Sequence, residues 1–296
     1  MNTINTLAQV FVQKLEAGVV PWYKPWATFG VPGRNAVTHT RYSGINWWTT
    51  MLAGFRSPYW LTLHQANQLG GRIRKGERST VIAYYRFESV EQIDGNSEKQ
   101  FRGVRHYRIF NLEQIELPPD ALPPQMYHTA QPFQLNTAAR LQQAEDIWML
   151  WEDKPSLIFG RDAMYSPASD TITMPRYELF SQPAEYYATL FHEAVHATGH
   201  QSRLARPGIT GSHRFGSKEY AWEELIAELG AARICYELGI EQETIDNAAS
   251  YLDHWIRVIY ETPALVWKAA AAAEKACKQI CGVIGFAEEY VAKKAG

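Results

Sequence analysis

A histidine-containing segment in the C-terminal half has the residue types and spacing of a metal site. His192 and His196 lie four positions apart with Glu193 between them, in the string FHEAVH. Because residues i and i+4 share one face of an α-helix, both imidazoles could bind one ion while Glu193 reaches a water molecule on it. This HExxH spacing predicts a metal-dependent hydrolytic site, with Glu193 as the general base for cleavage of a peptide bond.

The residues around this motif predict that it lies on a helix. Ser181 is a suitable N-cap, Pro183 suits the first helical position, and Gly199 marks the end. A single rigid helix would therefore fix the spacing of the two imidazoles.

A third protein ligand is expected on a second predicted helix, whose string WEELIAEL covers residues 222–229. Glu224 and Glu228 lie one helical turn apart and share a face, and their apolar neighbours argue against a fully solvated surface. We expect Glu224 to complete a His2Glu site, and Glu228 to accept a hydrogen bond from a ligand histidine, although the two roles could be exchanged. Ser202 stands where an HExxHxxGxxH protease has its third histidine, which disfavours that class. The ligand set predicts Zn²⁺, or another divalent ion such as Mn²⁺.

A proline-rich stretch separates two parts of the chain. Residues 117–132 contain five prolines, which interrupt helices and central strands. We therefore predict an N-terminal domain over residues 1–117, a linker over 118–134 and a C-terminal domain over 135–296.

Apolar periodicity predicts an α+β fold for both domains. In the N-terminal domain we expect helices over residues 3–17 and 62–69 and strands over 81–87 and 107–115. The C-terminal domain should begin with a helix over 135–151 and short strands over 157–159 and 171–174, followed by helices from about residue 183. The strand over 171–174 could pair with an extended peptide substrate or could equally be an ordinary core strand.

Charge is divided unequally between the two parts. Residues 1–130 contain 14 Lys and Arg against 9 Asp and Glu, whereas the remainder contains 15 against 22. The net charges of +5 and −7 suggest different partners for the two parts, with a polyanion for the first.

The basic part also contains many aromatic residues, which could stack on unpaired bases while the basic side chains contact phosphates. This combination favours single-stranded nucleic acid, although most of the rings could instead belong to the core. The candidate DNA-binding residues are Trp22, Lys24, Trp26, Arg41, Tyr42, Asn46, Trp47, Arg72, Arg74, Lys75 and Arg78.

The chain contains no apolar run of the roughly 20 residues that a membrane helix needs, and its N-terminus lacks the apolar block of a signal peptide. We therefore expect a cytoplasmic protein without a membrane partner.

Several strings in a fixed order resemble the ArdC-type antirestriction family of conjugative plasmids. They lie at residues 15–26, 42–46, 60–77 and 109–114, followed by the HExxH and ELIAE motifs. The resemblance implies an N-terminal single-stranded-DNA-binding domain, shared with TraC-type primases, and a C-terminal zincin-like metallopeptidase domain, mostly helical with a small sheet.

The resemblance further implies protection of incoming plasmid DNA from host restriction, with single-stranded DNA as a partner and a restriction-enzyme subunit or a peptide as a further one. Two alternatives remain open at this point. The chain could be a DNA-associated metalloprotease that cleaves a protein substrate, or a purely steric DNA-binding protector with a structural metal site.

Overall fold

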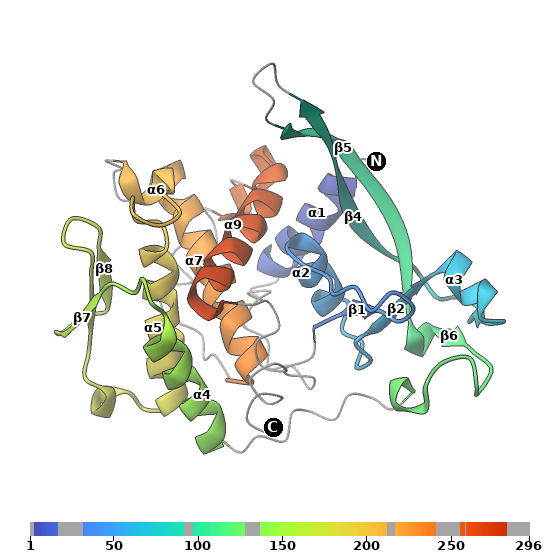
Figure 1. Cartoon of the computed structure of the whole chain (residues 1–296), viewed down its shortest axis with the longest axis horizontal. Helices are drawn as coiled ribbons and strands as arrows, with labels where there is room; N and C mark the ends of the chain where they lie inside the picture. The colour runs from blue at the N-terminus through green and yellow to red at the C-terminus, as the bar shows by residue number, and fades with distance from the viewer. Residues whose placement is uncertain are drawn as a thin grey trace. The chain divides into compact units, whose positions relative to one another are not determined.

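The computed structural model describes residues 3–16, 32–91, 97–127, 137–211, 217–240, 255–257 and 259–282. These residues form two compact units (Figure 1). The sheet unit comprises residues 32–129, and the helical unit combines residues 1–31 with residues 130–296. The expected two-domain α+β fold is confirmed. The domain limits at residues 117 and 135 stay a prediction, because a division into compact units does not show which segments fold independently.

A four-stranded sheet in the order β1-β2-β5-β4 forms the centre of the sheet unit. Strands β1 and β2 are parallel, and the other neighbours are antiparallel. A separate two-stranded sheet pairs β3 with β6. The strands are β1 (Arg34–Asn35), β2 (Tyr59–Thr62), β3 (Arg72–Ile73), β4 (Thr80–Glu91), β5 (Ser97–Asn111) and β6 (Ile115–Glu116).

Apolar side chains cover both faces of this sheet. Leu61 packs on one face with Ile115 and Met126, so the first residues of the predicted linker belong to this core. Trp60 and Ile109 pack on the other face. The helical segments here are α2 (Ile45–Leu52), α3 (Leu63–Gln68), η1 (Leu112–Gln114) and η2 (Pro124–Met126).

Strands β4 and β5 are much longer than the sequence predicts. Residues 97–106 are mostly polar and carry no apolar alternation, so their own pattern gives no strand signal. Pairing with β4 along almost its whole length supplies the backbone hydrogen bonds that hold them extended. In contrast, the predicted helix over 62–69 is confirmed as α3, because Thr62 and Gln65 form a capping box at its start.

The helical unit consists of packed helices with a three-stranded sheet at their side (Figure 1). The sheet has the order β7-β9-β8, with β7 parallel and β8 antiparallel to β9. The elements of the helical unit are α1 (Thr3–Glu16), α4 (Thr137–Leu150), β7 (Ser156–Phe159), β8 (Met164–Ser166), β9 (Thr171–Met174), η3 (Tyr177–Leu179), α5 (Pro183–Ala197), α6 (Pro207–Thr210), α7 (Lys218–Leu238) and α9 (Ala264–Cys281).

The N-terminal helix α1 belongs to the helical unit. It lies against α9, and the Tyr260 hydroxyl donates a hydrogen bond of 2.9 Å to the Glu16 carboxylate. Phe11 and Leu15 on this helix are buried. Segments from the two ends of the chain therefore share one core.

Strand β9 is the central strand of its sheet, with β7 on one side and β8 on the other. The strand predicted over 171–174 is thus confirmed, but its suggested pairing with a peptide substrate is wrong, because both of its edges are occupied.

Among the described helices, none combines the length and apolarity needed to cross a bilayer.

Candidate metal centre and nucleic-acid surface

Helix α5 presents the HExxH motif to the interior of the helical unit. Pro183 occupies the first helical turn as expected, but the N-cap is Gln182 rather than Ser181. Its backbone N–H lies 3.4 Å from the Glu185 carboxylate, so the residue three positions along supports the cap. Leu190, Phe191, Ala194 and Val195 are buried, and this apolar packing fixes the helix.

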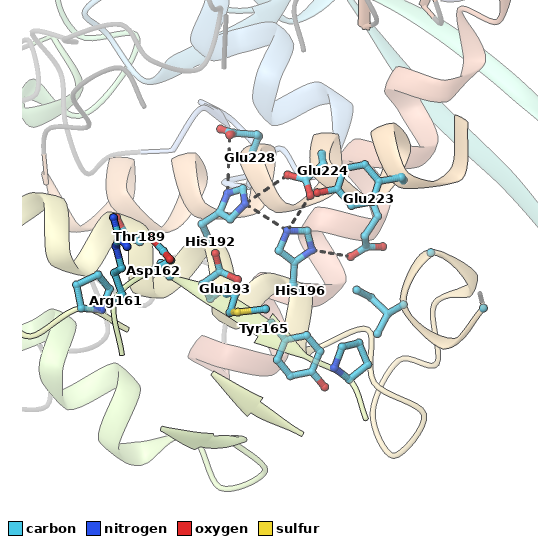
Figure 2. Close-up of a pocket in the computed structure, with 18 residues that line it drawn as sticks. Arg161, Asp162, Tyr165, Thr189, His192, Glu193, His196, Glu223, Glu224 and Glu228 are labelled. Carbon is cyan, nitrogen blue, oxygen red and sulfur yellow. Dashed lines mark hydrogen bonds and ion pairs between the residues drawn. The ribbon is translucent and has the colours of Figure 1, made fainter. Parts of the chain in front are cut away.

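Close packing against α7 brings carboxylates to the two imidazoles. A Cβ at Gly230 would lie 2.7 Å from a Val195 methyl group, so a side chain there would separate the two helices. Two and six residues earlier on α7, Glu228 and Glu224 lie beside the motif (Figure 2). The glycine therefore sets the separation on which the site depends.

Three predicted ligands converge on one point. The Nε2 atoms of His192 and His196 lie 3.2 Å apart. The Glu224 carboxylate lies 3.6 Å from each of them, with one oxygen directed at each nitrogen. Together these residues form a group whose ligand atoms all lie within 4.8 Å of one another.

This arrangement fits a divalent metal ion. Two nitrogens bound at about 2.0–2.1 Å to a tetrahedral ion lie about 3.3 Å apart, close to the separation of the two Nε2 atoms here. Two imidazoles and a carboxylate are also the donor set of a catalytic zinc site, which keeps a fourth position open. A cavity of about 690 Å³ borders the three side chains and leaves room for that position.

Each histidine has a carboxylate behind its other ring nitrogen. Glu228 lies 3.8 Å from Nδ1 of His192, which is an ion-pair distance but too long for a hydrogen bond. Glu223, which the sequence did not single out, lies 3.4 Å from Nδ1 of His196. Carboxylates in this position orient a ligand imidazole and raise its basicity.

Glu223 is itself held by a buried arginine. The Arg206 guanidinium contacts both carboxylate oxygens, at 2.5 Å from Nη2 and 3.0 Å from Nε. It also donates to the Thr198 hydroxyl and to the Val195 carbonyl. Arg206 therefore ties the carboxylate behind His196 to the end of α5.

These charges raise the pKa values of both imidazoles. Burial lowers the pKa of His192, but contact with Glu224 and the charge of Glu228 outweigh it and raise the pKa. Burial also opposes the charged form of His196, yet Glu224 and Glu223 raise its pKa well above the usual value. Burial raises the pKa of Glu224, but the two imidazoles hold it far below its usual range. Without a metal ion, the site therefore favours protonated histidines beside ionised carboxylates.

Metal affinity should consequently fall as the pH is lowered. Binding requires neutral imidazoles, so protons compete with the ion up to the raised pKa values of His192 and His196. We expect the apparent Kd for Zn²⁺ or Mn²⁺ to rise between pH 8 and pH 6, by about tenfold per pH unit for each proton displaced. Calorimetric titration in buffers of different ionisation enthalpy measures both the Kd and the number of protons released. An affinity independent of pH, with no proton release, would contradict this prediction.

Glu193 lines the same cavity as the three ligands (Figure 2). It is 9% exposed, so the side chain is buried but reaches the cavity wall. Edge strand β8 contributes Met164 and Tyr165 to another wall of the cavity. The arrangement is suited to proton transfer on a substrate held between β8 and α5.

The predicted DNA-binding residues fall into different environments. Trp22, Lys24 and Trp26 lie outside the described residues. Trp47 is 1% exposed, so its ring is part of the core and has no face available for a base. Tyr42 is also buried, which raises the pKa of its hydroxyl to about 12.

The Asn46 side chain is engaged within the protein. Its amide oxygen accepts from the Ala83 N–H at 2.8 Å, and its amide nitrogen donates to the Ala83 carbonyl at 2.6 Å. It therefore pairs with the backbone of β4, the edge strand of the sheet. Arg41 is half-buried, and its backbone forms an isolated antiparallel β-bridge with that of Arg34.

The basic residues around the β3–β4 turn are exposed. Arg74, Lys75 and Arg78 all face solvent. Arg72 is exposed too, but it forms an ion pair of 2.5 Å with Glu116. This turn therefore remains a predicted phosphate-binding segment.

Two protein-family models match this chain, one in its N-terminal part and one in its C-terminal part. The N-terminal domain of anti-restriction factor ArdC matches residues 1–112, and the zincin-like metallopeptidase family matches residues 151–272. Two Escherichia coli proteins named DNA primase TraC are 36% and 33% identical over 91% of this chain. The chain spans only 19% and 26% of their lengths, respectively.

Solved structures of the antirestriction ArdC protein from the R388 plasmid match almost the whole chain. One is metal-free and one is bound to Mn(II), with TM-scores of 0.72 and 0.73. Both are 32% identical, and the alignment covers 95% of this chain and 97% of theirs. An uncharacterised protein of Sinorhizobium fredii is 27% identical over 89% of this chain and 86% of its own length. The chain therefore belongs to the ArdC family of antirestriction proteins.

Proposed function

We propose that this chain binds single-stranded DNA and protects incoming plasmid DNA from host restriction, and that it carries a metal-dependent peptidase-like centre. The observation that carries this proposal is the match along 95% of the chain to the antirestriction ArdC protein. The net charge of +5 over residues 1–130 supports contact with a polyanion. The ArdC and TraC relatives support DNA binding by the same part of the chain.

The metal centre in this proposal consists of His192, His196 and Glu224, which form one converging group. The Mn(II)-bound relative supports a divalent ion, and the ligand set suits zinc. Such an ion, when bound, would act as a Lewis acid toward a carbonyl oxygen and lower the pKa of a water molecule. Glu228 remains the alternative ligand.

Glu193 is the proposed general base. From the cavity wall its carboxylate can accept a proton from water and deliver it to the nitrogen of the leaving amine. Glu223 and Arg206 hold the ring of His196 with Nε2 directed toward Glu224. These side chains are buried, which limits the water that can compete with a substrate at the site.

A second candidate function is cleavage of a protein on DNA, favoured by the free edge of β8 beside the cavity. Strand β8 pairs with β9 on one side, and no strand among the described residues pairs with its other side. An extended peptide could add to its other side and pass over Glu193. This pairing replaces the one predicted for residues 171–174.

The experiment that tests these functions measures survival of unmodified plasmid DNA on entering a restricting host. We expect the wild-type chain to raise survival, and Glu152→Gln, which changes an exposed carboxylate outside the cavity, to do the same. Loss of protection in Glu193→Ala, with metal content and fold retained, would assign protection to hydrolysis. Protection that persists in Glu193→Ala would assign it to DNA binding. If the wild-type chain protects nothing, the proposed function is wrong.

A further inference from the structure

The outer part of the β4–β5 hairpin presents two exposed aromatic rings on one face. Tyr84 is 62% exposed and Tyr107 is 41% exposed. Their ring centroids lie 6.4 Å apart with the planes at 85°, an edge-to-face contact that orients both rings. In Figure 1 the two strands continue side by side well beyond the short strands β1 and β2.

Strand register places two arginines on the same face as the rings. Tyr84 lies opposite Arg105, and Arg86, two residues along β4, lies opposite Gly103. Because alternate residues of a strand share a face and directly opposed residues project together, Tyr84, Arg86, Arg105 and Tyr107 form one surface. We call these four residues the hairpin face.

The hairpin face begins where the core of the sheet unit ends. Ile109, opposite Thr80, packs with Trp60 in a buried cluster, and Ile82, opposite Tyr107, packs against this cluster. Beyond them the same face carries tyrosines in solvent. Beside Arg86, Gly103 has a φ of +135°, and a Cβ at that position would meet no atom of the described part of the chain within 4 Å. The surface is therefore open to a ligand from the solvent side.

The charge around the hairpin face favours a nucleic acid over a protein with a basic or neutral surface. Residues 80–86 and 102–111, which contain the hairpin face, include four arginines and one histidine but no acidic residue, and the four acidic residues of the hairpin all lie in residues 88–98. Exposed rings flanked by arginines stack on unpaired bases and contact the phosphates between them. Duplex DNA would not offer its base faces to these rings, which favours single strands.

We infer that the hairpin face is the surface on which this chain holds single-stranded DNA, with Tyr84 and Tyr107 stacking on bases and Arg86 and Arg105 contacting phosphates. This inference rests on the proposed function and specifies its DNA-binding site. It differs from the sequence-based candidates, because none of these four residues is among them.

The test measures binding of a fluorescent oligo(dT) to the full chain by anisotropy over a range of salt concentrations. Tyr84→Thr/Tyr107→Thr keeps strand-forming residues but removes both rings, and should weaken binding by at least about 30-fold with little change in salt dependence. Arg86→Ala/Arg105→Ala should instead reduce the slope of log K against log salt by about 1.4. Tyr84→Phe/Tyr107→Phe, which keeps both rings, should bind like the wild-type chain.

Three results separate the possible failures. Circular dichroism and thermal unfolding establish whether each variant is folded, and the phenylalanine variant serves as the matched control for the strand. If the wild-type chain binds oligo(dT) and both hairpin variants bind equally well, the hairpin face is not the site although the proposed function survives. Loss confined to Arg74→Ala/Lys75→Ala would place the site on the β3–β4 turn and overturn the inference. If the wild-type chain does not bind oligo(dT), the DNA-binding part of the proposed function fails as well.

Discussion

Replacing Glu224 by alanine is expected to lower the affinity of the chain for Zn²⁺ or Mn²⁺ by more than about 100-fold. The carboxylate of Glu224 has one oxygen directed at each Nε2 atom, so its removal takes away one of three converging donors. Replacing Glu228 should cost less, about 10- to 100-fold, because this residue lies behind Nδ1 of His192 and acts through that ring. Metal titration of the purified full-length variants gives both affinities.

This pair of variants decides between the two roles that the spacing of the glutamates leaves open. A larger loss for Glu228→Ala than for Glu224→Ala would show that Glu228 is the ligand. Glu152→Gln, remote from the cavity, should bind metal like the wild-type chain. Equal affinities in all the variants would exclude both glutamates as ligands and contradict the His2Glu site.

Replacing Arg206 by methionine is expected to destabilise the helical unit by about 3–5 kcal/mol, the usual effect of removing one partner from a buried ion pair. The Glu223 side chain is only 3% exposed and would lose the guanidinium that contacts both of its oxygens, leaving the His196 imidazole as its charged neighbour. Urea denaturation of the metal-free chain measures this change in unfolding free energy. A loss below about 1 kcal/mol would mean that water or another group replaces the guanidinium.

The double variant Arg206→Met/Glu223→Met separates stability from positioning. Replacing both charges by apolar groups should restore most of the lost stability. Metal affinity should nevertheless stay about 10- to 100-fold below wild type, because Nδ1 of His196 has lost the carboxylate 3.4 Å away. Full recovery of affinity together with stability would show that Glu223 and Arg206 serve the fold alone.

A second buried arginine provides a matched control. Arg203 forms an ion pair with Asp170, and its side chain is as buried as that of Glu223. It also donates to the Ala197 carbonyl at 2.7 Å, near the end of α5. Arg203→Met should therefore reduce stability while leaving metal affinity unchanged, since neither residue contacts the imidazoles. Loss of affinity in this variant would mean that general loosening of the unit disturbs the site.

Local patterns in the sequence predict the motif-bearing helix and the candidate ligands. The i, i+4 spacing of His192 and His196 depends only on helical geometry, so it places the two imidazoles on one face of the helix. The same reasoning places Glu224 and Glu228 on one face of α7. Capping residues such as Thr62 similarly determine where a helix begins.

Tertiary packing decides which role each of these candidate residues has. The sequence shows neighbouring glutamates on α7 but cannot show which of them faces each imidazole, because that depends on the rotation of α7 about its axis and on its separation from α5. The close approach at Gly230 fixes the separation. It brings Glu223 to His196. Arg206 contacts Glu223 from a loop, where the sequence has no helix or strand periodicity that could predict the contact.

The nucleic-acid surface depends even more strongly on tertiary structure than the metal centre does. Composition identifies the basic, aromatic part of the chain, but burial depends on contacts between residues distant in sequence. Trp47 lies in the core, whereas Tyr84 and Tyr107 are exposed together because of the register of β4 and β5. Residue type and local spacing thus determined the chemistry available to this protein. Only the tertiary structure decided which side chains meet and which face solvent, because burial and register are set by long-range packing that no local pattern encodes.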